Sequence, residues 1–180
     1  LLSERYESTL GLDVSEPLVG TALSLRRPGR GLSFAVNQEP DLRGLESASF
    51  DLVLCAYVLQ HNPPWLSGRY IHEFARILKP GGTLALQMHG ATVNPILRLV
   101  PPAMIYSPVN LWNRRSASNA THELNRRWDT YWIRPSRIRR LLSGKNMVVQ
   151  ATIRESEPQG RLISYWFRAV KLADRAHPVG

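Results

Sequence analysis

Residues 50–88 constrain the fold more than any other part of this chain. They begin with a near-continuous apolar run, FDLVLCAY at 50–57, as is typical of a strand buried on both faces in a parallel sheet. After the chain breaker NPP, apolar residues recur at helical spacing from Trp65 to Leu78, where KPGG ends the helix. A further strand, Thr83–Met88, follows. The stretch therefore predicts a strand, a helix and a parallel strand.

The flanking segments extend this pattern. Further predicted strands and helices are Thr9–Val14, Ser15 to about Arg26, Leu32–Val36, Pro135–Ser143, Met147–Ile153 and Leu162–Val170. The last two strands are joined by the short turn SEPQG, which predicts an antiparallel hairpin. Alternating strands and helices indicate an α/β fold with a mostly parallel, doubly wound sheet. Right-handed crossovers should place helices on both faces of that sheet.

Composition excludes several classes of protein. Hydrophobic residues make up 43% of the 180 residues and charged residues 21%, a globular balance. No apolar run is long enough for a transmembrane helix, and no signal peptide is visible, so we expect a cytoplasmic protein. The single cysteine, Cys55, excludes an internal disulfide framework and a cysteine-cluster zinc site, and we predict no metal site.

The net charge of +9 is concentrated in one segment. Residues 114–145 hold nine basic residues and two acidic ones. Such a segment could attract phosphates, nucleic acid or an anionic membrane. The alternative is a solvated helical face whose Arg stems cover apolar surface.

Four pieces of the sequence resemble the class I S-adenosylmethionine (SAM)-dependent methyltransferases, of the methyltransferase type 11 kind. They are GLDVS at 11–15, SFDLVLCAYVLQH at 49–61, EFARILKPGGTLAL at 73–86 and the C-terminal hairpin. The resemblance implies a Rossmann-like fold, SAM as the cofactor and methyl transfer to a small-molecule acceptor. It leaves open the acceptor atom and the oligomeric state.

One family feature is not found in this sequence. The family opens with a strand and a Gly-rich loop of the D/E-x-G-x-G type upstream of the motif that GLDVS resembles, whereas only eight residues precede the first predicted strand here. We therefore expect an N-terminally truncated fragment of a longer methyltransferase, with weak SAM binding and no activity on its own. The alternative is a degenerate, non-catalytic SAM-fold binding domain.

Asp13 is the main candidate for cofactor binding. A carboxylate at the end of a parallel strand can accept hydrogen bonds from the two hydroxyls of a ribose, although an acid there also favours the N-terminus of the next helix. The resemblance implies that Val14 and Leu18 lie at the cofactor and that Leu18 packs against the adenine. It also places Gln38 and Glu39 where the family often has an acid that receives the adenine amino group.

Residues 55–61 are the candidates for the methyl-transfer end of the site. Cys55, Ala56 and Tyr57 end the predicted strand at the edge where open α/β sheets bind ligands. We expect Cys55 to be a small buried residue rather than a nucleophile. His61 is the candidate general base, because imidazole exchanges protons near neutral pH, and the alternative is a loop histidine without a role. His89 is a second candidate, whereas His72 is expected to be structural.

The expected domain organisation has four parts. Residues 1–90 form a partial SAM-binding core, 91–130 a cap, 131–172 a helix and hairpin that complete the sheet, and 173–180 a tail. Aromatic residues of the cap and its border are expected to form either an acceptor pocket or the core of the cap: Tyr106, Trp112, Trp128, Tyr131 and Trp132. The basic segment leaves an RNA-directed methyltransferase as the alternative activity.

Overall fold

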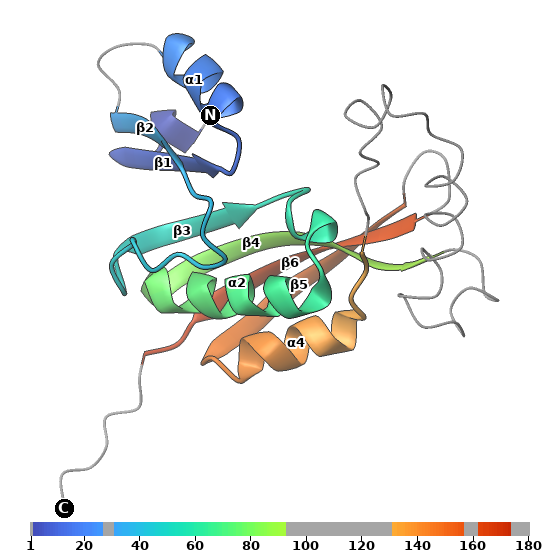
Figure 1. Ribbon diagram of the computed structural model, residues 1–180. Coiled ribbons are helices and arrows are strands. Elements are labelled where there is room, and N and C mark those ends of the chain that lie inside the picture. The colour runs from blue at the N-terminus through green and yellow to red at the C-terminus, as the bar shows by residue number, and fades with distance from the viewer. Residues whose placement is uncertain (1, 27–30, 93–130, 157–161, 174–180) are drawn as a thin grey trace, which may run out of the picture. The chain divides into compact units, whose positions relative to one another are not determined.

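The computed structural model describes residues 2–26, 31–92, 131–156 and 162–173 (Figure 1). The chain divides into two compact units, Leu1–Leu42 and Arg43–Gly180. The predicted cap, which includes Tyr106, Trp112 and Trp128, lies outside the described residues.

The first unit is a parallel strand pair with a crossover helix. After a short 3-10 turn, η1 (Leu2–Glu4), come β1 (Ser8–Asp13), α1 (Glu16–Ser24) and β2 (Gly31–Val36). β1 and β2 are parallel and in register from their first residues to their last. The three elements predicted here are confirmed, although α1 ends at Ser24 rather than near Arg26, because Leu25 already forms its C-cap.

A glycine allows the two strands of this unit to pack closely. The ring of Phe34 on β2 covers Gly11 on β1, and a β-carbon at Gly11 would lie 2.5 Å from the Cδ1 atom of that ring. A side chain at this position would therefore force the ring to move. The glycine of the GLDVS motif is thus required by the packing of the strand pair.

The second unit is built on a four-stranded sheet in the order β3-β4-β6-β5. Its strands are β3 (Phe50–Cys55), β4 (Leu78–Thr92), β5 (Met147–Ser156) and β6 (Leu162–Lys171). β3 and β4 are parallel, whereas β6 is antiparallel to both β4 and β5. The predicted C-terminal hairpin is confirmed, and its second strand lies between the first strand and β4.

Two helices cover one face of this sheet, α2 (Pro64–Ile77) and α4 (Pro135–Ser143) (Figure 1). Both begin with a proline, which is well tolerated in a first helical turn. Alternate residues of β4 are fully buried together with apolar residues of the helices and of β6: Leu84, Leu86, Met88, Ile71, Ile138, Leu142 and Phe167. This is the hydrophobic core of the unit.

The KPGG segment forms a bulge within β4. β4 begins at Leu78, directly after α2, and pairs with Phe50 there; the pairing with β3 resumes only between Thr83 and Leu52. Gly81 has a φ of +81°, a conformation that glycine adopts without strain. The sequence predicted the end of the helix to within one residue, but it placed the start of the strand five residues too late.

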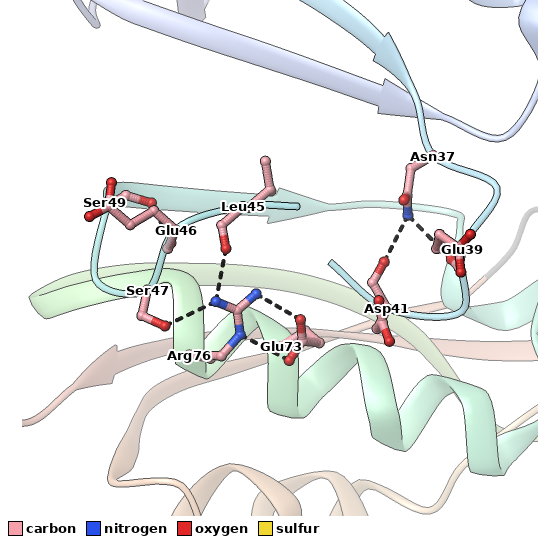
Figure 2. Close-up of polar contacts among 9 residues, drawn as sticks. All are labelled: Asn37, Glu39, Asp41, Leu45, Glu46, Ser47, Ser49, Glu73 and Arg76. Atoms are coloured by element: carbon pink, nitrogen blue, oxygen red, sulfur yellow. Dashed lines mark hydrogen bonds and ion pairs between the residues drawn. The ribbon is translucent and has the colours of Figure 1, made fainter. Parts of the chain in front are cut away.

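The loop before β3 is held by one arginine of α2 (Figure 2). Nη1 of Arg76 donates to the carbonyl of Leu45 at 2.8 Å and to the hydroxyl of Ser47 at 3.0 Å. Its other nitrogens form a bidentate pair with the carboxylate of Glu73 at 2.8 and 3.0 Å. This arrangement fixes the course of the chain into β3.

Strands of the described residues form two sheets, and no described strand joins them. Each sheet has the strand directions that the α/β prediction required. None of the helices in the described ranges is long and apolar enough to cross a membrane.

Candidate functional site

Asp13 is the last residue of β1, at the carboxyl end of the strand pair in the first unit. Its Oδ1 accepts a hydrogen bond from the backbone N–H of Ser15 at 2.8 Å, and Ser15 is the N-cap of α1. This local bond uses one carboxylate oxygen and fits the interpretation of Asp13 as an acid at the start of the next helix. Within the described part of the chain, no hydrogen bond to the second oxygen is formed, and the side chain is exposed.

Apolar side chains beside Asp13 are exposed. Leu18 is 58% exposed and Val14 is 65% exposed. An apolar helix residue usually packs into the core, but Leu18 does not within this unit. These two side chains offer an apolar surface next to a carboxylate.

The loop after β2 brings Gln38 to the same edge of the first unit. Nε2 of Gln38 donates to Oε1 of Glu16, in the first turn of α1, at 3.4 Å. The backbone N–H of Asn37 donates to the carbonyl of Asp13 at 2.9 Å. The Asn37 side chain also donates to the carbonyls of Glu39 and Asp41, as Figure 2 shows.

In the second unit, Cys55 ends β3 and is buried. Burial raises the pKa of its thiol to about 12, against a smaller opposing effect of a hydrogen bond with the Leu59 backbone. The thiol is therefore protonated at neutral pH and is not a nucleophile. This agrees with the expectation from the sequence.

Tyr57 has a strained backbone. Its φ is +59°, in the left-handed region, which costs a non-glycine residue about 1 kcal/mol or more. Its backbone N–H donates to Oε1 of Gln87 at 3.0 Å, and its ring meets that of Trp166 edge to face, with centroids 6.3 Å apart. The prediction that the strand extends to Tyr57 was wrong, because Cys55 is the last residue of β3.

His61 ends a short 3-10 turn, η2 (Leu59–His61). Its Nε2 lies 3.2 Å from Nε2 of Gln60. An amide nitrogen always carries its protons, so His61 Nε2 is the acceptor in this bond and the neutral ring carries its proton on Nδ1. The basic nitrogen of His61 is therefore Nε2.

The sequence did not reveal a group of polar residues inside the sheet. Gln87 is fully buried on β4, and Ser164 is buried opposite on β6. Gln87 Nε2 donates to Ser164 Oγ at 3.1 Å, and Nδ1 of buried His89 lies 2.8 Å from the same oxygen. The available signal was QMH, which places polar residues at alternate positions of an apolar strand.

Two buried polar atoms lie near the border of the cap. Among the described residues, Gln60 Oε1 and Trp132 Nε1 have no hydrogen-bond partner. The backbone N–H of Tyr131 donates to the carbonyl of Gln60 at 2.6 Å, which connects η2 with the segment around Trp132. A buried polar atom without a partner is costly, so a bound molecule that pairs with either atom would gain affinity.

The remaining candidates are on the helices. His72 lies on the exposed side of α2, and partial burial, with the charge of Lys145, lowers its pKa, whereas Glu73 opposes the shift. Arg137, Arg139 and Arg140 on α4 are exposed. No group of three or more potential metal-ligating side chains occurs in the part of the chain that the structure covers.

The family model described as a methyltransferase domain matches residues 1–86. Among curated proteins, the ubiquinone biosynthesis O-methyltransferase of Methylococcus capsulatus is 29% identical over 140 residues, which are 77% of this chain and 53% of that protein. The chain therefore spans about half the length of that relative.

Solved structures show the same fold. A SAM-dependent methyltransferase from Methanosarcina mazei aligns with a TM-score of 0.66 at 20% identity, over 96% of this chain and 86% of that one. Magnesium protoporphyrin IX methyltransferase from Synechocystis PCC 6803 with bound S-adenosylhomocysteine aligns with a TM-score of 0.62 at 20% identity, over 94% and 67% of the two chains.

Proposed function

We propose, from the family match over residues 1–86 and from the fold, that this chain is a class I SAM-dependent methyltransferase that transfers the methyl group of SAM to a small-molecule acceptor. In this reaction the sulfonium S–CH3 bond breaks as the bond from the acceptor to the methyl group forms. S-adenosylhomocysteine leaves, and a base takes the proton of the acceptor. The protein has mainly to align the two reactants.

The observation that carries the proposal is the position of Asp13. It ends a parallel strand directly before a helix, is exposed, and uses one carboxylate oxygen locally. The second oxygen can accept from a ribose hydroxyl, as acids at this position of open α/β sheets do. The exposed side chains of Val14 and Leu18 are proposed to contact the adenine.

Gln38 and Glu39 are proposed to recognise the adenine amino group. Gln38 donates through Nε2 to Glu16, so its Oε1 is the atom that would accept from an amino group. The exposed Glu39 offers a carboxylate for the same purpose.

The end of β3 is proposed to lie at the methyl donor. Ala56 and the strained Tyr57 follow the last residue of the strand. Positive φ at a bulky residue is concentrated at functional sites, which supports this role. Buried Cys55 would only shape the wall of the site. His61 is proposed as the base, with Nε2 exchanging its hydrogen bond to Gln60 for the proton of the acceptor.

A small acceptor is favoured by the relatives and by the buried polar atoms. Two similar proteins are named for small molecules: one is a ubiquinone biosynthesis O-methyltransferase and the other a magnesium protoporphyrin IX methyltransferase. Gln60 Oε1 and Trp132 Nε1 could pair with an acceptor that carries both a donor and an acceptor group. The domain organisation with a cap at 91–130 and the cytoplasmic location remain predictions.

RNA is the second candidate acceptor. Residues 131–154 contain six basic residues and no acidic one, and the basic side chains are exposed: Arg134, Arg137, Arg139, Arg140, Lys145 and Arg154. An RNA-directed enzyme should lose affinity for RNA steeply as salt increases, in proportion to the number of phosphates contacted. Salt-independent binding would contradict this alternative.

Calorimetric titration of the protein with SAM tests the proposal. Asp13→Ala should weaken binding by about tenfold or more, since hydrogen bonds to a charged group contribute about 1.5–3 kcal/mol. Glu7→Ala is the matched control, because it removes an exposed carboxylate that directly precedes the start of β1, away from Asp13, and should leave the affinity unchanged. Equal dissociation constants for Asp13→Ala and the wild type would defeat the assignment.

A further inference from the structure

We propose that Gln87 and Ser164 set the tautomer of His89, so that its ring carries the proton on Nε2 and serves as a hydrogen-bond donor and not as a base. Gln87 and Ser164 are thus positioning residues. The assignment of the tautomer stands on the hydrogen bonds alone, whereas its use in binding a methyl acceptor rests on the proposed function.

The first step fixes the orientation of the Gln87 amide. A backbone N–H can only donate, and that of Tyr57 lies 3.0 Å from the Gln87 side chain, so the carbonyl oxygen Oε1 must face it. The left-handed turn at Tyr57 therefore determines which end of the amide points the other way. That end is Nε2, which can only donate.

The second step fixes the Ser164 hydroxyl. Gln87 Nε2 donates to Ser164 Oγ at 3.1 Å, so this bond occupies a lone pair of the hydroxyl and leaves its single proton for another partner. Ser164 and Gln87 are both buried, so water cannot take that proton. Among the described residues, the hydroxyl contacts only Gln87 and His89.

The third step fixes the imidazole of His89. Its Nδ1 lies 2.8 Å from Ser164 Oγ. If Nδ1 carried a proton, the buried hydroxyl would accept two bonds and its own proton would have no partner, which is unfavourable. Ser164 therefore donates to Nδ1, and in the neutral ring the proton is on Nε2.

This order of donors has a chemical consequence. In this state Nε2 already carries a proton and the lone pair of Nδ1 is bound to Ser164. The ring of His89 therefore cannot take a proton from the methyl acceptor at Nε2. His61 has the opposite arrangement, because its Nε2 accepts from Gln60. The two histidines thus have different roles, with His61 as the proposed base and His89 as a hydrogen-bond donor through Nε2.

Nitrogen-15 NMR of histidine-labelled protein tests the tautomer directly, since protonated and unprotonated ring nitrogens have separate signals. For neutral His89, assigned by comparison with His89→Gln, we expect an unprotonated Nδ1 and a protonated Nε2. A protonated Nδ1 in the wild type would overturn the proposal, whatever the variants do.

Two substitutions test the direction of the network. Gln87→Glu places an acceptor opposite Ser164 when the new carboxyl is ionised, so the hydroxyl turns toward it and Nδ1 of His89 gains a proton. Gln87→Met removes both amide groups but leaves Ser164 free to donate to His89, so Nδ1 stays unprotonated. The carbon-13 signal of the new carboxyl shows at which pH the Gln87→Glu side chain is ionised. If the Nδ1 signal of His89 is unchanged in Gln87→Glu at that pH, the proposal is contradicted.

These outcomes are independent of cofactor binding. If SAM does not bind but the Nδ1 signals behave as expected, the proposed function fails and the tautomer assignment stands. If SAM binds and Asp13→Ala weakens it, but Nδ1 of the wild type is protonated, the tautomer assignment fails alone.

Discussion

Cys55 is the residue whose chemistry is most clearly determined by burial, because burial raises the pKa of its thiol to about 12. At pH 8 a thiol reagent such as 5,5′-dithiobis(2-nitrobenzoic acid) should react with the native protein only as fast as the protein opens, because the thiolate is scarce and inaccessible. In urea the same thiol should react within the mixing time. Rapid stoichiometric modification of the native protein would contradict the buried position.

His72 is the residue whose titration depends on a neighbouring charge. Burial and the Lys145 ammonium lower its pKa, so Lys145→Gln should raise the pKa of His72 in an NMR titration. Lys79→Gln, which removes an ammonium paired with Asp51, is the control and should leave it unchanged. A His72 pKa that is identical in wild type and Lys145→Gln would rule out this electrostatic effect.

The sign of the effect on stability follows from the direction of the shift. The folded pKa of His72 lies below the ordinary value of about 6.5, so the unfolded chain binds the proton more readily. The contribution of neutral His72 to the free energy of unfolding is complete above about pH 6.5. It decreases as the pH falls from there toward the pKa of His72 in the folded protein. Lys145→Gln should narrow this pH range.

At the scale of elements, the loop that leads into β3 is held against α2 by Arg76. Arg76→Lys keeps the charge but cannot hold Glu73 through two parallel bonds while also donating to Leu45 and Ser47. We expect a loss of about 1–2 kcal/mol in the free energy of unfolding, measured in urea. Arg137→Lys on the exposed face of α4 is the control, with an expected change within about 0.5 kcal/mol. Equal losses in the two variants would refute the role of Arg76.

Helices and strands with a regular apolar pattern were predictable from the sequence, whereas the residues at which they end were harder to predict. The α2 pattern ended at KPGG as predicted, because helix signals are local. The end of β3 was missed because the N–H of Tyr57 bonds to a side chain 30 residues away instead of to a neighbouring strand. A sequence pattern holds no direct signal for such a long-range contact.

The same limit applies to the candidate site. The position of Asp13 at the end of a strand and before a helix was predictable, because both signals are close in sequence. The bond between Gln87 and Ser164 joins residues 77 positions apart and was missed. Only the sheet register that places β6 beside β4 brings these residues together.

For the whole molecule, the central claim is that Asp13 holds the ribose of SAM, and a cycle of ligand and protein changes tests it most directly. The wild-type protein and Asp13→Ala are each titrated with S-adenosylhomocysteine and with its 2′-deoxy analogue. The wild type should bind the deoxy analogue more weakly, by about tenfold. Asp13→Ala should bind both ligands equally, because the partner of that hydroxyl is gone. If Asp13→Ala distinguishes the two ligands as strongly as the wild type does, the ribose is held elsewhere and the claim is wrong.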